Sequence, residues 1–246
     1  MTRQRADLAL VARGLAPSRA RAQAAIKAGQ VVSGTRAITR PSDPIDDDAP
    51  LALLGSGHGW VSRGGIKLAH ALAYFGLSPA GRICLDIGAS TGGFTEVLLA
   101  NDAKYVYAVD VGHNQLSVRL RNDPCVRVME ECNARHLAQD AIPEPIGALV
   151  CDVSFIGLRL ALPAGLALCA PGAFAIALIK PQFEAGRGAI GKGGIVRDPA
   201  IHRAVCDTIE TWWSALPSWR VIGVTDSPIA GGDGNREFLI AAEKSA

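Results

Sequence analysis

LDIGASTGGFTEVLL, from Leu85 to Leu99, is the stretch that decides the fold of most of this 246-residue chain. It reads as an apolar strand, a loop of small residues and a helix. From Arg82 onward, apolar strands alternate with amphipathic stretches, a pattern typical of a mostly parallel sheet covered on both faces. We therefore predict a Rossmann-like α/β domain with a seven-stranded sheet and helices on both faces, in which the last two strands form an antiparallel edge.

Ligands in such folds bind at the carboxyl ends of the strands. Gly88, Ser90 and Gly92, in the loop after the first strand, would let a cofactor approach the backbone closely. The spacing G-x-x-x-G-G differs from the dinucleotide fingerprint G-x-G-x-x-G, which disfavours NAD. The loop suits S-adenosylmethionine, and the plain alternative is that these glycines are ordinary turn residues.

Polar residues end the other predicted strands. Asp86 is expected to orient the cationic amino-acid part of S-adenosylmethionine, directly or through water, and Asp110 to accept hydrogen bonds from both ribose hydroxyls. Asn133 is placed to meet the adenine edge, and Asp152 ends the fourth strand. Two alternatives stay open, because Asn133 fits a turn and Asp152 fits a helix cap.

Three residues are not needed for a cofactor pocket. Lys180 follows the apolar strand AFAIALI, Lys67 lies at the start of a helix, and Glu237 lies where a glycine-rich loop enters the final strand. Methyl transfer to a hydroxyl needs positioning and removal of a proton, and a lysine can orient the oxygen or accept the proton. As a base it must be neutral near pH 7, against a reference pKa of about 10.4. A second ammonium, Lys67 near Lys180, lowers the pKa of the lysine, and the carboxylates of Asp152 and Glu237 raise it. Whether the lysine is neutral therefore stays open.

The net charge of +2 conceals an asymmetry. Residues 1–42 hold eight Lys or Arg and one acid, a charge of +7, and the remainder has a charge of −5. Such asymmetry is typical of a basic module that binds nucleic acid, although a solvated basic surface is the plain alternative. The basic side chains expected to follow phosphates are Arg19, Arg21, Lys27, Arg36 and Arg40.

The composition suggests where the domains divide. We predict a basic module at residues 1–47, a linker at 48–59 that follows a stretch of prolines and aspartates and ends in the glycine-rich GSGHG, and the larger domain at 60–246. Within the basic module, the sequence predicts two short helices stopped by Gly14 and Gly29, and then a hairpin-like pair of strands.

The cysteines and apolar segments bear on the compartment. The six cysteines form no CxxC pair or Cys/His cluster, so we expect a reduced, cytoplasmic protein without a metal site. The N-terminus lacks the apolar core of a signal peptide. The uncharged stretch 160–179 has the length of a membrane span, but Pro171-Gly172 divides it into a predicted helix and strand. We therefore expect no stable membrane association.

The segment RADLALVARGLAPSRARAQAAIKAGQVVSGTRAITRPSDPI resembles the S4 RNA-binding domain along nearly its whole length. It has the order helix, GL-xx-SR-xxA, helix, AG-xV and turn. Ala6 departs from the larger apolar residue usual at that position. The resemblance implies a small N-terminal α+β domain that binds RNA.

The remaining motifs, VSRGGIKL, LDIGASTGGFTEVLL, CDVSFI, LIKPQFE, GGIVRDP and GNREFL, resemble the TlyA (hemolysin A) family of ribosomal RNA 2′-O-methyltransferases. The resemblance implies an FtsJ-like, S-adenosylmethionine-dependent domain with a catalytic tetrad at Lys67, Asp152, Lys180 and Glu237. It also implies that the partners are ribosomal RNA or ribosomal subunits. The implied target is a cytidine in the small (16S) and, in some members, the large (23S) subunit.

Some implications of this resemblance stay open. The linker reads GHGWV and lacks an arginine two residues before Trp60, so coupling between the domains does not carry over by analogy. A non-catalytic RNA-binding or ribosome-assembly protein is one alternative function, and a membrane-active hemolysin is another. The sequence leaves the oligomeric state open.

Overall fold

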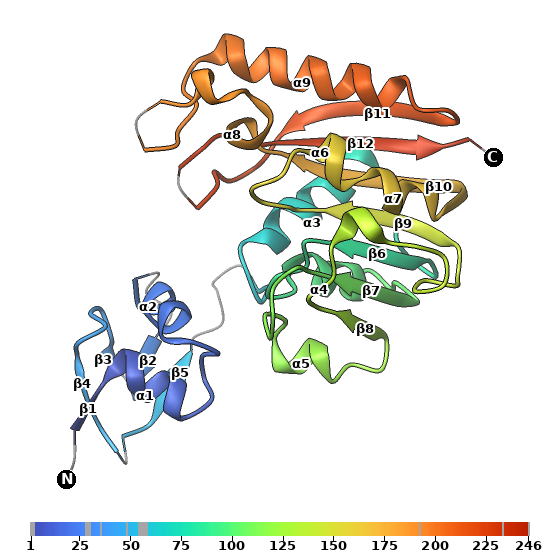
Figure 1. Ribbon diagram of the computed structural model, residues 1–246. Coiled ribbons are helices and arrows are strands. Elements are labelled where there is room, and N and C mark those ends of the chain that lie inside the picture. Colours follow the sequence, from blue (N-terminus) through green and yellow to red (C-terminus); the bar gives the residue numbers. More distant parts are fainter. Residues whose placement is uncertain are drawn as a thin grey trace. The chain divides into compact units, whose positions relative to one another are not determined.

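The chain forms two compact units, Met1–Gly59 and Trp60–Ala246 (Figure 1). The computed structural model describes residues 3–27, 31–34, 36–47, 49–53, 59–191, 193–232 and 234–245. Each unit has its own apolar core.

The N-terminal unit combines two helices with short antiparallel strands. Three strands form a sheet in the order β3-β2-β5, and β1 pairs with β4. The elements are β1 Arg3–Arg5, α1 Ala6–Ala12, α2 Arg19–Lys27, β2 Val31–Ser33, β3 Arg36–Ala37, β4 Pro44–Asp46 and β5 Leu51–Leu53. The two predicted helices and the strand pair are confirmed, and Gly29, the predicted stop of the second helix, lies outside the described residues. Gly14, with φ +68°, follows the end of α1, and the backbone N–H of Arg21 donates to Ser18 Oγ at 3.3 Å at the start of α2.

Strand β5 differs from the expectation for residues 48–59. Leu51–Leu53 lies within the predicted linker but pairs antiparallel with β2, where Val31 lies opposite Leu53. A strand of only three residues has no periodicity of its own, and only pairing with β2 defines it. Residues 48 and 54–58 of the predicted linker lie outside the described residues.

A buried carboxylate links the helices of this unit. Asp7 has no exposed side-chain surface, and it accepts hydrogen bonds from Arg5 at 3.0 Å, Arg19 at 2.9 Å and Gln23 at 2.8 Å. The hydrogen bond from Arg5 lowers the pKa of Asp7 most; together with those from Gln23 and Arg19 it outweighs burial and holds that pKa well below its usual range. Asp7 therefore ties α1 to α2 in a unit whose apolar core is small.

The larger unit is built on a seven-stranded sheet in the order β11-β12-β10-β9-β6-β7-β8. Neighbouring strands are parallel, except that β12 runs antiparallel to both β10 and β11. The strands are β6 Ile83–Ile87, β7 Tyr105–Val109, β8 Val126–Met129, β9 Ile146–Cys151, β10 Cys169–Ile179, β11 Trp219–Asp226 and β12 Phe238–Lys244. The predicted mostly parallel sheet and its antiparallel edge are confirmed.

Helices cover both faces of this sheet (Figure 1). Along β6, Cys84 packs with the residues of α3 and α4, whereas Leu85 and Ile87 pack with those of α6, α7 and α9. Burial on both sides explains the continuous apolar strands. The helices are α3 Gly64–Phe75, α4 Gly93–Ala100, α5 Val118–Arg121, η1 Ala134–His136, α6 Leu158–Ala161, α7 Pro163–Ala167, α8 Pro181–Glu184, η2 Arg187–Ala189 and α9 Pro199–Ser214.

The apolar stretch 160–179 folds differently from the predicted helix, turn and strand. Pro163 begins the short helix α7, and β10 already starts at Cys169. The strand continues through Pro171-Gly172 because its register with β9 shifts between Cys169 and Phe174. Within the described ranges, no helix combines the length and the apolarity that a bilayer crossing requires.

We expect Asp7→Asn to loosen the N-terminal unit, because the amide removes the negative charge and turns N–H groups toward the arginines. Hydrogen exchange should accelerate in α1 and α2 and stay unchanged in α9, and the exposed Asp47→Asn variant serves as the control. Since the pKa of Asp7 is depressed, its stabilisation is present above the usual value of 3.8 and is lost as the pH falls through the lower folded value. Equal exchange in both variants would contradict a stabilising role for Asp7.

Candidate active site

The polar residues expected at the strand ends lie at one edge of the sheet. Asp86 is the next-to-last residue of β6, and Asp110, Asp152 and Lys180 directly follow β7, β9 and β10. Parallel strands bring their carboxyl ends to a common edge, so these four side chains come from neighbouring positions.

The reversed strand β12 adds a residue to the same edge. Because β12 is antiparallel to β10, its first residue lies where β10 ends, and Ile179 pairs with Phe238. The residues just outside this pair are Lys180 and Glu237. Two residues that are 57 positions apart in the sequence are thereby brought beside each other.

Two lysine–carboxylate pairs occupy this edge. Lys180 Nζ lies 2.6 Å from Asp152 Oδ1 and donates a hydrogen bond to Ser154 Oγ at 3.0 Å. Lys67 of α3 donates to Glu237 Oε2 at 2.6 Å. Both lysines and Glu237 are buried, and a buried charge is tolerated only when it is paired. The four residues of the tetrad implied by the family resemblance thus form two ion pairs.

Helix α3 connects the two pairs. Its first turn lies beside Asp152, since a Cβ on Gly64 would be 3.8 Å from Asp152 Oδ2. Lys67 lies one turn further along the same helix. The N-terminus of a helix favours a nearby negative charge. Helix α3 therefore stabilises the charge of Asp152 and also carries Lys67.

The glycine-rich loop owes its shape to packing against the chain. Gly88 has φ +85°, and a Cβ on it would lie 2.5 Å from the carbonyl oxygen of Asp152. Gly92 has φ +99°, and its Cβ would lie 2.2 Å from Leu120 Cδ1. Ser90, between them, also has a positive φ of 48°. The expected close approach of a cofactor is therefore not the sole reason for these glycines, because each is also required by a neighbouring segment.

Asp86 is fully buried beneath this loop. Its Oδ2 accepts a hydrogen bond from Thr95 Oγ1 at 2.6 Å, while its buried Oδ1 has no hydrogen-bond partner among the described residues. Burial, reinforced by the charges of Asp152 and Asp110 and opposed by the bond from Thr95, raises the pKa of Asp86 to about 7. An unpartnered buried acceptor of this kind suits a cationic or hydrogen-bonding ligand.

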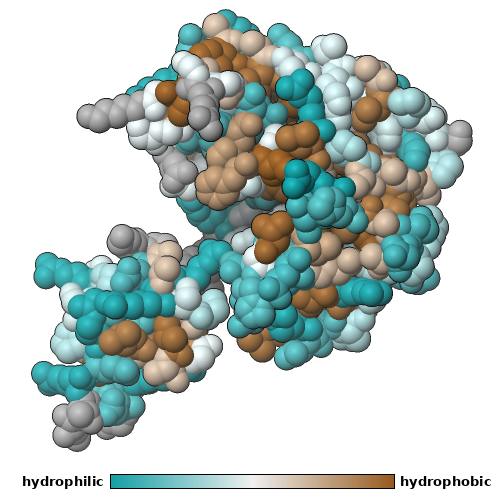
Figure 2. All heavy atoms as spheres, viewed as in Figure 1, coloured by the Kyte–Doolittle hydropathy of each residue, from teal (hydrophilic) through white to brown (hydrophobic). Residues whose placement is uncertain are grey.

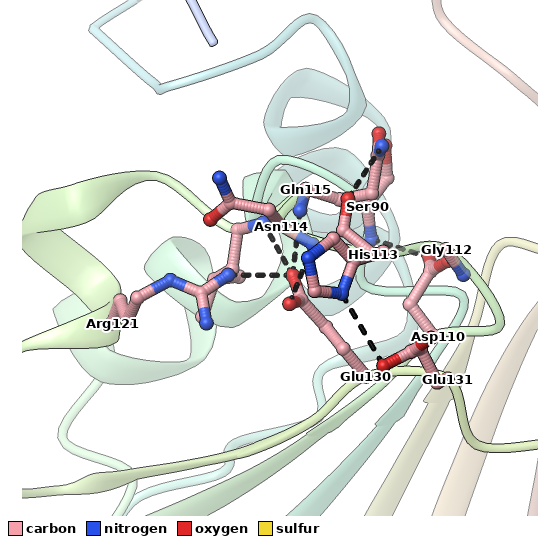
Figure 3. Close-up of polar contacts among 10 residues, drawn as sticks. Ser90, Asp110, Gly112, His113, Asn114, Gln115, Arg121, Glu130 and Glu131 are labelled. Carbon is pink, nitrogen blue, oxygen red and sulfur yellow. Dashed lines mark hydrogen bonds and ion pairs between the residues drawn. The ribbon is translucent and has the colours of Figure 1, made fainter. Parts of the chain in front are cut away.

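Asp110 and Asn133 make local contacts with the backbone. Asp110 accepts hydrogen bonds from the backbone N–H groups of Ser90 at 2.8 Å and Gly112 at 2.7 Å, as Figure 3 shows. It thereby joins the loop after β6 to the loop after β7. Asn133 Oδ1 caps η1 by accepting from Arg135 N at 3.1 Å, which is the turn role left open above.

Glu130, which the sequence did not single out, organises the loop after β7. Its carboxylate accepts from the backbone N–H groups of Asn114, Gln115 and Leu116 and from Arg121, at 2.6 to 3.0 Å (Figure 3). Burial alone would raise the pKa of Glu130, but these hydrogen bonds outweigh it and lower the pKa to about 2. The hint in the sequence was the acid pair EE at the end of a strand.

An exposed aromatic side chain lies close to the lysine pairs in the sequence. Phe155, three positions after Asp152, is 91% exposed and has φ +68°, an uncommon conformation for a bulky residue. Its ring centroid is 5.2 Å from that of Phe183 in α8. Apolar residues reach the surface of the larger unit in several places (Figure 2), and Phe155 is the most exposed of the large hydrophobic residues described. Only the two phenylalanines in CDVSFI and KPQFE hinted at this feature.

The predicted basic residues of the N-terminal unit differ in their surroundings. Arg19 in α2 is half exposed and forms the ion pair with Asp7, so it has a structural contact besides any ligand role. Arg21, Arg36 and Arg40 are exposed. The side chain of Lys27 lies outside the described residues.

Comparison with known proteins covers both units. Residues 60–244 match the FtsJ-like methyltransferases, and residues 4–49 match the S4 domain. The chain is 48% identical to YqxC of Bacillus subtilis, provisionally named an rRNA methyltransferase, over 97% of this chain and 85% of that protein. It is 44% identical to the 16S/23S rRNA (cytidine-2′-O)-methyltransferase TlyA of Mycobacterium tuberculosis, over 97% of this chain and 89% of that protein.

A solved structure extends the likeness to three dimensions. It is that of a provisionally named hemolysin from Streptococcus thermophilus, with 45% sequence identity and a TM-score of 0.78, over 100% of this chain and 90% of that one. The sheet, its helices and the polar edge define a Rossmann-like methyltransferase that carries an S4 domain. The chain belongs to the TlyA family of FtsJ-like methyltransferases, as the sequence motifs predicted.

We expect Glu130→Gln to free the loop at 112–117, because the amide turns an NH₂ group toward backbone N–H groups that need an acceptor. Hydrogen exchange at Asn114, Gln115 and Leu116 should accelerate in this variant. Glu210→Gln is the matched control, since Glu210 is an exposed residue of α9, away from this loop. In the wild type, these amides should stay protected from exchange as the pH falls below 4.5. Their protection should be lost only as the pH approaches 2, the approximate pKa of Glu130 in the folded protein. Unchanged exchange in Glu130→Gln would show that other contacts hold the loop.

Proposed function

We propose that this methyltransferase transfers a methyl group from S-adenosylmethionine to the 2′-hydroxyl of a cytidine in ribosomal RNA, in 16S rRNA and with 23S rRNA as a second target. The observation that carries the proposal is the buried ammonium of Lys180, held by Asp152 and Ser154 at the strand ends, beside the pair of Lys67 and Glu237. The name of the M. tuberculosis relative supports the cytidine ribose as the target.

The residues at the strand ends fit S-adenosylmethionine. Asp86 offers its unpartnered buried oxygen to the ligand ammonium, and Asp110 offers carboxylate lone pairs to the ribose hydroxyls. In this proposal, Gly88, Ser90 and Gly92 shape the loop over the amino-acid part, and Asn133, whose Oδ1 caps η1, faces the adenine with its Nδ2. Asp152 adds negative charge on the same side. When bound, the cofactor supplies an electrophilic methyl group on a sulfonium.

Lys180 would position the attacking hydroxyl. An ammonium has three N–H donors; within the described chain, Lys180 donates one hydrogen bond, to Ser154 Oγ, and Asp152 Oδ1 lies beside it as an ion-pair partner. A donor is then available to a lone pair of the 2′-oxygen, which fixes the direction of attack. With S-adenosylmethionine held at the strand ends, its sulfonium would supply the methyl group to the 2′-oxygen and keep the electron pair as a thioether, and the carboxylate of Asp152 beside Lys180 would accept the hydroxyl proton.

The pair of Lys67 and Glu237 would hold the neighbouring side of the site. Both are buried, and their contact at 2.6 Å fixes each side chain. Charged groups that are already oriented when the substrate arrives lose little energy to reorganisation during the reaction. We propose that this pair keeps the ribose in place beside Lys180.

The N-terminal unit would supply affinity for RNA. Residues 1–42 have a charge of +7, and the exposed arginines Arg21, Arg36 and Arg40 belong to this segment. Arg19 and Lys27 complete the predicted set. Contacts with phosphates bind RNA without reading its sequence, so this unit would hold the substrate while the larger unit selects the nucleotide. Phe155 offers a flat apolar surface on which a base can stack.

We predict that Lys180→Ala abolishes methyl transfer while S-adenosylmethionine still binds, because Lys180 lies toward the hydroxyl and not among the proposed cofactor ligands. The rate of transfer of radiolabelled methyl groups to ribosomal subunits should fall by about 100-fold or more. Binding is measured by calorimetry, and Lys104→Ala is the control, because Lys104 is exposed and precedes β7 at the opposite edge of the sheet. Retained turnover in Lys180→Ala would overturn the assigned role, and a wild-type protein that methylates no RNA would overturn the function.

We also predict that S-adenosylmethionine binds more tightly as the pH rises through 7. The pKa of Asp86 is about 7, so Asp86 is neutral below that pH and becomes the anion that attracts the ligand ammonium above it. Calorimetric titrations between roughly pH 6 and pH 8 should show this trend in the wild type and not in Asp86→Asn. The same pH dependence in both proteins would exclude Asp86 as its cause.

A further inference from the structure

A buried asparagine next to Glu237 connects two loops of the larger unit. Asn235 is 1% exposed; its Oδ1 accepts a hydrogen bond from Val196 N at 3.0 Å, and its Nδ2 donates to Gly194 O at 3.1 Å. Turning the amide over would place a donor against a donor and an acceptor against an acceptor. The segment at 194–196 is therefore held in a single orientation against the loop that precedes β12.

A histidine from α9 holds the other side of the same segment. His202 Nε2 lies 3.0 Å from Val196 O, and because a carbonyl only accepts, Nε2 carries the hydrogen. The buried ring also packs edge-on against Phe238, with centroids 5.7 Å apart. Val196 is thus bonded at its N–H by Asn235 and at its carbonyl by His202.

The backbone of Asn235 closes the loop from which Glu237 emerges. Gly231 N donates to Asn235 O at 2.9 Å, and Ser227 N donates to Glu237 O at 2.9 Å. Gly231 lies so close to Glu237 that a Cβ on it would be 2.6 Å from Oε1. The carboxylate therefore has little freedom to turn away from Lys67.

We propose that Asn235 is a positioning residue, which fixes the segment at 194–196 against the loop before β12 and thereby keeps Glu237 directed at Lys67. Asn235 acts through Glu237 and touches no reacting atom. The sequence assigned no chemical role to the motif GGIVRDP. In this proposal it holds the loop that carries Glu237 and so stabilises the Lys67–Glu237 pair. The inference rests on the proposed function, because its catalytic consequence requires methyl transfer.

Kinetics of Asn235→Ala in the full chain test the catalytic part of this proposal. We expect kcat for methyl transfer to ribosomal subunits to fall by about tenfold or more, since small misplacements of catalytic groups are costly. The KM for S-adenosylmethionine should stay within about twofold, because the cofactor ligands are untouched. In a Glu237→Gln background, Asn235→Ala should lower kcat by less than about twofold. The effects on kcat of two residues that act together are not additive. The exposed Asn122→Ala is the matched control.

Hydrogen exchange tests the structural part without relying on activity. Exchange at residues 194–196, 227–232 and 234–237 should accelerate in Asn235→Ala and in His202→Phe, which keeps a ring against Phe238 but loses the N–H to Val196. His202→Phe should also lower kcat, and it keeps the test open if Asn235→Ala does not fold.

Three outcomes would overturn the inference: unchanged exchange in these segments, an unchanged kcat when exchange has accelerated, or an equal loss of kcat in the Glu237→Gln background. A wild-type protein without methyl transfer would instead overturn the proposed function, while the exchange data would still decide whether Asn235 and His202 hold the segment at 194–196.

Discussion

The burial of two ammonium groups at one edge of a parallel sheet constrains the rest of the larger unit. Lys180 and Lys67 lie in surroundings where an unpaired charge would be very costly, so each requires a carboxylate at ion-pair distance. Asp152 comes from the adjacent parallel strand, but Glu237 reaches the edge only because β12 runs in the opposite direction. The reversed strand, which looks like an appendage to a parallel sheet, is therefore what allows the second pair to form.

Much of this arrangement could be predicted from the sequence, because it depends on local patterns. Continuous apolar strands separated by helices predicted the sheet, and the residues that end those strands had to meet at one edge. The sequence pattern therefore predicts that Asp86, Asp110, Asp152 and Lys180 lie together. It also placed Glu237 at the start of the final strand, although the sequence did not pair it with Lys67.

The features that escaped prediction depend on contacts between distant segments. Gly88 reads as a residue for cofactor approach, but its closest constraint is the carbonyl of Asp152, 64 positions away. Asp7 reads as the one acid among residues 1–42, and only the fold reveals that it is fully buried between arginines. Glu130 and Phe155 carry no periodicity or spacing that marks them. Such residues are defined by what the tertiary structure brings to them, and the sequence alone records only their type.

The direct test of the account is a map of ribose methylation in ribosomal RNA from cells that contain the wild-type protein, the Lys180→Ala variant, or no copy of the protein. A 2′-O-methyl group blocks alkaline cleavage of the next phosphodiester bond, so each modified position reads out at single-nucleotide resolution. The account predicts at least one cytidine that resists cleavage only with the wild-type protein. Identical maps from all three kinds of cell, or a modification found only on bases, would contradict ribose methylation at the site that Lys180 and Lys67 form at the edge of the sheet.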